Sequence, residues 1–160
     1  MIKMIVSGGQ AGADQGGLFG AVKARVRTGG WAPKGWWTEC GQQKSILSAY
    51  NLKEHPRNGY PARTEANVAD SDGTVLFGLI QSPGSQLTKK YCLQLNKPLM
   101  HIPVVGGNIV GYTRAVDGFF EWVESNGIET LNVSGNRESK NLGIYKSVAA
   151  FIQMGVTVSE

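Results

Sequence analysis

The sequence predicts an α/β protein: a Rossmann-like three-layer sandwich with a mainly parallel sheet of about five or more strands. Short apolar runs rich in β-branched residues alternate about five times with segments whose apolar residues recur at helical spacing. The composition, 41% hydrophobic and 18% charged, is typical of a globular protein, and 160 residues can bury a sizeable core. We therefore expect one domain over residues 1–160.

The first half of the chain contains fewer regular elements than the second. Pro56, Asn58-Gly59 and Pro61 interrupt regular structure over 41–60, so we expect an irregular loop excursion at about 32–60. A long irregular segment in a compact domain is more often functional than filler. The elements expected in the first half are a strand at 3–6, a helix at 14–26 with Asp14 as its N-cap, and a short strand near 27–31.

The second half alternates regularly between helix and strand. Its helix at 113–125 should bury Val116, Phe119, Phe120 and Val123, and its last helix should bury Ile144, Val148, Phe151 and Ile152. The helices expected in the second half lie at 62–70, 86–95, 113–125 and 140–154, and the strands at 74–77, 98–102 and 129–135. Ligands of such sheets bind beyond the carboxyl ends of the strands, so the candidate loops are 7–14, 78–88, 103–112 and 134–140.

Charge and cysteine content exclude several classes of function. The net charge is +4, but the basic residues are scattered without interleaved aromatics, which disfavours a nucleic-acid polymer and suits a small anionic ligand. Cys40 and Cys92 lie far apart and the two histidines are isolated, so we expect no metal site and two free thiols. The chain shows no signal peptide and no membrane-spanning run, so we expect a cytoplasmic protein.

The glycine-rich turn after the first strand is a candidate anion site. Backbone N–H groups at a helix N-terminus bind anions, and Ser7-Gly8-Gly9-Gln10-Ala11-Gly12, followed by Ala13 and Asp14, could supply them. The turn matches neither G-x-G-x-x-G nor a P-loop, because no G-K-[ST] follows. An ordinary tight strand-to-helix turn is the alternative, and this turn alone does not decide between the two.

Two further turns favour phosphate binding. The segment 82–88 is a small-residue turn that opens a helix, in which Gly84 lets a ligand approach and Ser85 and Thr88 offer hydroxyl groups. Arg137, in the turn after the last strand, could grip an oxyanion through two hydrogen bonds.

Other candidate residues lie outside these turns. Arg63 and Asn67 are four residues apart and share a helical face, whereas Glu65 faces elsewhere; a solvated surface helix is the alternative. Lys34 lies among Trp31, Trp36 and Trp37, which could form a lid, a stacking platform or a subunit interface. No Ser-His-Asp arrangement is present, and Cys40 has no identifiable base, so no catalytic residue is assigned.

Five segments together resemble the molybdenum carrier (molybdenum cofactor carrier protein) family. They are SGGQAGAD at 7–14, GGWAPKG at 29–35, ARTEANVADSDGTVLF at 62–77, PGSQLT at 83–88 and LNVSGNRES at 131–139. The resemblance covers nearly the whole chain in the family order. It places the chain in the SLOG, lysine-decarboxylase-like Rossmann superfamily, which includes cytokinin-activating phosphoribohydrolases and domains that bind nucleotide signals.

The resemblance implies a homo-oligomer, dimer or tetramer, that binds a phosphorylated small molecule, with molybdenum cofactor as cargo. By motif, the ligand would contact Gly8, Gly9, Gln10, Gly12, Asp14, Lys34, Arg63, Glu65, Gly84 and Ser85, to which the turn and helix arguments add Ser7, Ala13, Asn67, Thr88 and Arg137. The family usually has Thr at Ala11, Arg at Gln15 and Pro at Asn136. These departures would retune phosphate binding.

Three functions follow from the resemblance. The first is a carrier or storage protein for molybdenum cofactor. The alternative is a binding module for a nucleotide-derived signal of the ADP-ribose or cyclic-nucleotide type. The third is a nucleoside-monophosphate phosphoribohydrolase. In those enzymes a catalytic Glu follows the Thr of the glycine-rich turn, whereas Lys89, Lys90 and Tyr91 follow Thr88 here, which argues for binding rather than hydrolysis.

Overall fold

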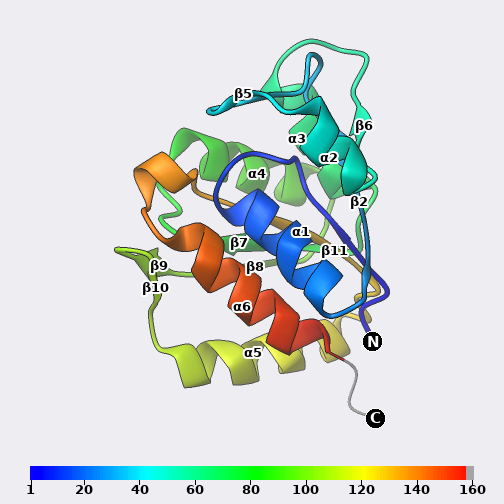
Figure 1. Cartoon of the computed structure of the whole chain (residues 1–160). Helices are drawn as coiled ribbons and strands as arrows, with labels where there is room; N and C mark the ends of the chain where they lie inside the picture. The colour runs from blue at the N-terminus through cyan, green and yellow to red at the C-terminus, as the bar shows by residue number, and fades with distance from the viewer. Residues whose placement is uncertain (158–160) are drawn as a thin grey trace.

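A five-stranded, entirely parallel sheet forms the centre of the computed structural model, which describes residues 1–157 (Figure 1). The strand order is β2-β1-β11-β7-β8. Each central pair is in continuous register, for example Val133 opposite Val75. The expected Rossmann-like α/β fold is therefore confirmed. The strands are β1 (Met4–Val6), β2 (Arg27–Gly29), β7 (Gly73–Phe77), β8 (Leu99–Ile102) and β11 (Thr130–Gly135).

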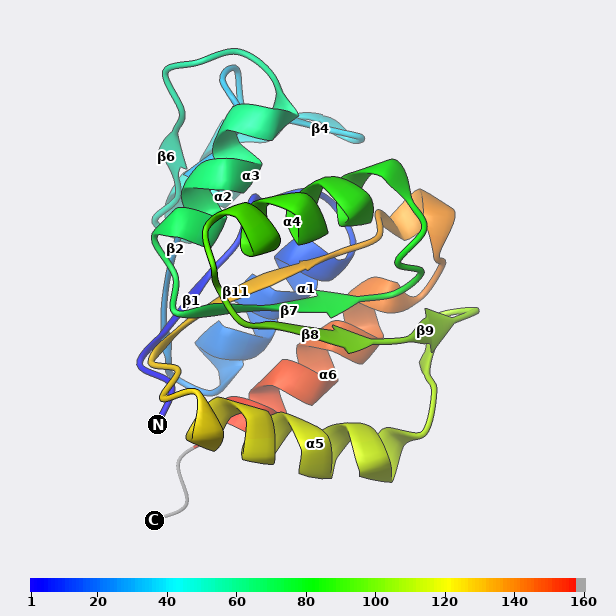
Figure 2. The same ribbon diagram turned by 180° about the vertical axis from the view of Figure 1, so that it is seen from behind.

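Helices cover both faces of this sheet. Figure 2 shows α4 on one side of β7 and β8 and α5 and α6 on the other, while α3 lies beside α4 and α1 beside α6. Alternate side chains of β7 and β11 point to opposite faces of the sheet, so one face is apolar and the other more polar. Val75 and Val133 point to the apolar core. On the α4 side, Asn132 donates a hydrogen bond to Thr74. The helices are α1 (Ala13–Lys23), α3 (Tyr60–Ala69), α4 (Pro83–Gln94), α5 (Tyr112–Ser125) and α6 (Ile144–Val156).

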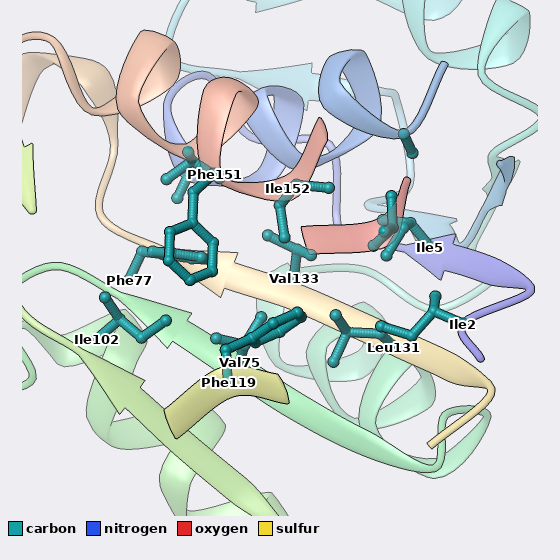
Figure 3. Close-up of a cluster of buried hydrophobic side chains, with 14 of the residues drawn as sticks. Ile2, Ile5, Val75, Phe77, Ile102, Phe119, Leu131, Val133, Phe151 and Ile152 are labelled. Atoms are coloured by element: carbon teal, nitrogen blue, oxygen red, sulfur yellow. The ribbon is translucent and has the colours of Figure 1, made fainter. Parts of the chain in front are cut away.

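The main core lies between the sheet and α1, α5 and α6 (Figure 3). Phe77, Phe119 and Phe151 are fully buried, and the Phe151 ring meets the other two edge-on at centroid distances of 5.5 and 5.3 Å. The α1 and α6 backbones pack closely because glycines face the partner helix. A Cβ on Gly16 would lie 2.6 Å from the carbonyl oxygen of Tyr145.

The strand order is that of a doubly wound sheet in which the chain starts at an inner strand of the usual order, as in a circular permutation. Counted from β7 instead of β1, the order becomes 2-1-3-4-5, the flavodoxin-like arrangement. The two ends of the described chain lie close together, and Ile2 and Val156 line one hollow (Figures 1 and 2). The point where the strand order reverses lies between β7 and β11, and ligands of such sheets bind outside the carboxyl ends there.

The segment between β2 and α3 carries short elements that the sequence did not predict. Within 41–60, where no regular element was expected, α2 (Lys44–Ala49) is helical; it buries only Leu47, too little to show a helical period. Leu47 joins Leu18, Ala32 and Leu52 in a second apolar cluster. The short strands here are β3 (Trp31–Ala32), β4 (Trp37–Thr38), β5 (Gly41–Gln42) and β6 (Lys53–Glu54).

Smaller differences from the sequence prediction concern loops and helix ends. The expected loop 103–112 contains a hairpin of β9 (Val104–Val105) and β10 (Asn108–Ile109). The fourth helix starts at Pro83, three residues earlier than expected, because Ser82 caps it. Phe120 was expected in the core but is half exposed, whereas its neighbour Phe119 is buried. Within residues 1–157, no helix combines the length and the apolar character needed to cross a membrane.

Candidate functional site

A cavity of about 450 Å³ lies at the carboxyl ends of β7 and β11, where the strand order reverses. Four segments far apart in the sequence line it: the turn after β1, the start of α3, the start of α4, and the turn after β11. The residues that line the cavity are Gln10, Asp14, Tyr60, Arg63, Thr64, Ser82, Pro83, Gly84, Leu87, Thr88, Ser134, Gly135, Asn136, Arg137 and Lys140.

The first turn of α4 exposes its backbone to this cavity at Gly84. Ser82 is the N-cap, and its Oγ accepts a hydrogen bond from the Ser85 amide at 3.3 Å. Pro83 has no N–H group, and a Cβ on Gly84 would meet no atom within 4 Å. The Gly84 amide is one of the first-turn donors without an acceptor inside its own helix. A ligand oxygen can therefore approach the helix end at Gly84.

Asn136 holds the α4 turn against the end of β11. Its Oδ1 accepts from the Leu79 amide at 2.6 Å, and its Nδ2 donates to the Leu79 carbonyl and to Ser82 Oγ, each at 3.2 Å. Asn141 Nδ2 donates to the same Oδ1 and to the Val104 carbonyl, so the loop after β8 joins this network. These hydrogen bonds fix the cavity walls relative to one another.

Several amides of the turn after β1 already have acceptors within the protein. Gly9 N–H donates to Ser7 Oγ, Gln10 N–H to Asp14 Oδ2 and Ala13 N–H to the Asn136 carbonyl, at 3.1–3.2 Å. This turn therefore contributes the side chains of Gln10 and Asp14 to the cavity lining.

Two arginines share one aromatic ring at the cavity. The guanidinium carbons of Arg63 and Arg137 lie 5.2 and 5.7 Å from the centre of the Tyr60 ring. Within residues 1–157 neither arginine forms an ion pair with a carboxylate. Arg63 donates from Nη1 to Thr64 Oγ1 at 2.7 Å, and its Nε is buried without a partner. Two cationic side chains thus lie together with unused hydrogen-bonding capacity.

Gly8 provides the surface on which the Arg63 guanidinium rests. A Cβ on Gly8 would lie 2.7 Å from Arg63 Cζ, so a larger residue would displace the guanidinium. Burial lowers the pKa of Arg63, and the nearby charge of Arg137 lowers it further, whereas Asp14 and Tyr60 raise it. The position of Arg63 is therefore held by the cavity wall rather than by a direct ion pair.

Asp14 is the buried acid of the cavity. Burial raises its pKa from 3.8 to about 6, and the effect is opposed by the charge of Arg63 and by hydrogen bonds from the amides of Gln10 and Gly8. An ionised Asp14 is consequently unfavourable in this buried position, and protonation removes that cost.

Comparison with known proteins agrees with this topology. Residues 5–156 match the model of the circularly permuted YpsA SLOG family. The chain belongs to this family. A crystal structure described as a "putative molybdenum carrier protein", from Syntrophus aciditrophicus SB, is 36% identical and has a TM-score of 0.87, with 97% of this chain and 95% of that chain covered. No curated protein matches the chain. The resemblance found in the sequence is thereby confirmed.

The SLOG domain brings six of the fifteen residues that the sequence nominated to the cavity lining. Gln10, Asp14, Arg63, Gly84, Thr88 and Arg137 line the cavity. Ser7, Gly8 and Ser85 lie just behind its surface: Ser7 Oγ donates to the Asp14 carbonyl, and Ser85 Oγ accepts from Ser82. Thr88 Oγ1 donates to the Gly84 carbonyl and lies 3.3 Å from Ser134 Oγ.

The remaining nominated residues lie elsewhere. Gly9 faces Leu47 and Leu52, and Gly12 packs on the backbone of 136–138, as Ala13 does through its amide. Asn67 holds β3 by exchanging hydrogen bonds with the backbone of Trp31. Lys34 and Glu65 do not line the cavity. Trp31 donates to Asp70 and Trp36 packs on the second cluster, so Trp37 is the one exposed member of the three tryptophans.

Sequence reasoning missed several residues that matter for the cavity. Tyr60, Thr64 and Lys140 were not nominated, and Asn136 was noted only as a departure from the family pattern. Tyr60 begins α3 directly after the Asn58-Gly59 turn, one helical turn before Arg63. Because residues one turn apart share a helical face, this spacing could have predicted that Tyr60 lies beside Arg63. Over the described residues 1–157, no cluster of three His, Cys, Asp or Glu side chains could hold a metal ion.

Proposed function

We propose that this SLOG domain binds a phosphorylated small molecule in the cavity between β7 and β11, with molybdenum cofactor, a pterin phosphate, as its cargo. The observation that carries the proposal is the pair of guanidinium groups over Tyr60, neither of them in an ion pair within the described residues. Like charges held this close repel each other, and a bound anion removes that repulsion.

The geometry favours a phosphate over other anions. Arg63 and Arg137 can each donate two parallel hydrogen bonds to phosphate oxygens, which ammonium groups cannot do. The start of α4 adds an N-terminal helix dipole and the accessible backbone at Gly84. Lys140 lines the same cavity and adds a further positive charge.

The size of the cavity favours a small molecule. About 450 Å³ is within the range of small-molecule sites and accommodates a pterin or a nucleoside carrying its phosphate. Molybdenum cofactor is the first cargo to test because the similar solved protein carries the name of a molybdenum carrier.

Native mass spectrometry tests the proposal directly. The protein is purified from its own host without chelators, and the mass of the intact chain is compared with that of the denatured chain. We expect a non-covalent adduct that contains phosphorus, and a released pterin supports molybdenum cofactor. A released nucleotide supports the alternative, a nucleotide-signal binding module, and a chain without any phosphorylated adduct contradicts the proposal.

A matched pair of variants links the adduct to the cavity. Arg63→Ala should reduce affinity for the released compound by roughly tenfold to a hundredfold, through loss of charge-assisted hydrogen bonds. Arg114→Ala removes the same charge from the exposed part of α5 and should bind like the unmodified protein. Equal affinity in both variants would show that the compound binds somewhere else.

A further inference from the structure

The Asp14 carboxyl lies in the same cavity as the two unpaired guanidinium groups. It is 5% exposed, its Oδ2 accepts the Gln10 amide at 3.2 Å, and it lines the cavity together with Arg63, Arg137 and Lys140. An anion held by these cations therefore sits close to a carboxylate of the same sign. Asp14 therefore competes with a bound anion for the positive charges of Arg63, Arg137 and Lys140.

We propose that Asp14 takes up one proton when a dianion occupies this cavity, so that the site is a proton-coupled anion site. This rests on the proposed function, because it concerns regulation of the same cavity. As a carboxylate, Asp14 repels the dianion in a poorly solvated environment. As a carboxylic acid, it carries one O–H donor that can hydrogen-bond an anionic oxygen. Protonation therefore removes the repulsion and lets Asp14 donate a hydrogen bond to the bound anion.

The proton balance can be stated completely. A proton from solvent adds to one carboxylate oxygen of Asp14, and no covalent bond to the ligand forms or breaks. The net charge of the lining becomes more positive by one as the dianion enters. Without a ligand, burial already raises the pKa of Asp14 to about 6, so at pH 7 the carboxyl is mostly ionised and a small further rise of its pKa is enough to protonate it.

Asp14 is the one carboxylic acid among the described residues that line the cavity, so the proton uptake is assigned to it. Asp14 shares the cavity with Tyr60 and Arg63 of α3 and with Arg137 and Lys140 after β11, and the charge of Arg63 acts on it. Glu138, next to Arg137, accepts the amides of Gly143 and Tyr145 at the start of α6. His55 and His101 do not line the cavity.

Sulfate is a suitable probe, because it remains a dianion from pH 5 to 8 and so brings no titration of its own. Calorimetric titrations of the full chain in two buffers with different ionisation enthalpies measure the protons taken up on binding. At pH 7 we expect uptake of half to one proton. Between pH 6.5 and 7.5 the affinity should fall about three- to tenfold, because a ligand that raises an acid's pKa binds more weakly as the pH rises.

Two variants separate Asp14 from other acids. Asp14→Asn keeps an oxygen for the Gln10 amide, and it should bind sulfate without proton uptake and with an affinity that is flat over this range. Asp117→Asn, which makes the same change on an exposed residue of α5, should retain both effects.

Sulfate binding to the unmodified protein without proton uptake would overturn the inference, and so would uptake that persists in Asp14→Asn. Failure of sulfate to bind even at pH 5 would also overturn it. If Asp14→Asn does not fold, the two-buffer measurement on the unmodified protein still decides. The proposed function fails separately, when the chain from its own host carries no phosphorylated adduct.

Discussion

Replacing Asp14 with asparagine should raise the free energy of unfolding near neutral pH. At pH 4 the same substitution should have almost no effect. Asp14 is buried, and its pKa in the folded protein is about 6, compared with 3.8 for an unperturbed carboxyl. The folded state therefore binds the Asp14 proton more tightly than the unfolded state. A group of this kind favours folding fully below pH 4, and that contribution is lost as the pH rises through 6.

The size of the effect follows from the two pKa values. Each pKa unit corresponds to about 1.4 kcal/mol, so an ionised Asp14 destabilises the fold by about 3 kcal/mol at pH 7 relative to its protonated form. Asparagine has the shape of the protonated carboxyl and retains an acceptor for the Gln10 amide. The free energy of unfolding of Asp14→Asn should therefore exceed that of the unmodified protein by about 3 kcal/mol at pH 7.

Urea denaturation at half-unit steps from pH 4 to pH 8 measures this difference. We expect the gain to be constant above about pH 6.5 and to approach zero at pH 4, because only the ionised carboxyl is penalised. Asp117→Asn, on an exposed residue of α5, should show no such dependence. A gain that is equal at pH 4 and pH 7, or a loss of stability at pH 7, would refute the assignment of a raised pKa to Asp14.

Two other substitutions probe the cavity walls. Gly8→Ala should reduce sulfate affinity about tenfold while unfolding stability changes little, because the added Cβ meets the flexible Arg63 side chain; Gly118→Ala on α5, where the Cβ would lie 3.5 Å from Met100 Cε, is its control, and equal losses in the two would contradict the reasoning. Asn136→Ala should destabilise the fold by about 2–4 kcal/mol in urea denaturation, because it removes three partly buried hydrogen bonds to Leu79 and Ser82, whereas Asn58→Ala in an exposed loop should not; a neutral Asn136→Ala would show that the network is dispensable.

The fold was predictable because its elements follow simple periods. The stripe of Ile144, Val148, Phe151 and Ile152 in α6 is fully buried, as the helical spacing predicted. Val75, Leu76 and Phe77 form a continuous apolar run because β7 is covered on both faces. The short elements between β2 and α3 were not predictable. The helix α2 buries a single leucine, and the strands of this segment are only two residues long.

The site was predictable only in its parts. Arg63 and Arg137 were nominated from separate motifs 74 positions apart, and nothing local indicates that they meet over Tyr60. Asn67 shares a helix with Arg63, yet it binds the backbone of Trp31, because β3 crosses that part of α3. Which polar groups serve the cavity and which hold the fold depends on strand order, a non-local property.

The permuted strand order explains why the first glycine-rich turn is not where a phosphate is best placed. In a doubly wound sheet the phosphate turn lies at the switch in strand order, which for many chains is the first strand-to-helix turn. Here β1 is one strand removed from the switch, and its turn directs its amides to Ser7, Asp14 and Asn136. The helix that starts at the switch is α4, and its first turn remains open at Gly84. The turn after β1 instead supports Arg63: the guanidinium packs on Gly8, and Asp14 lies near it. The permuted chain start therefore puts the turn that comes first in the sequence one strand away from the helix end at which we propose that the anion binds.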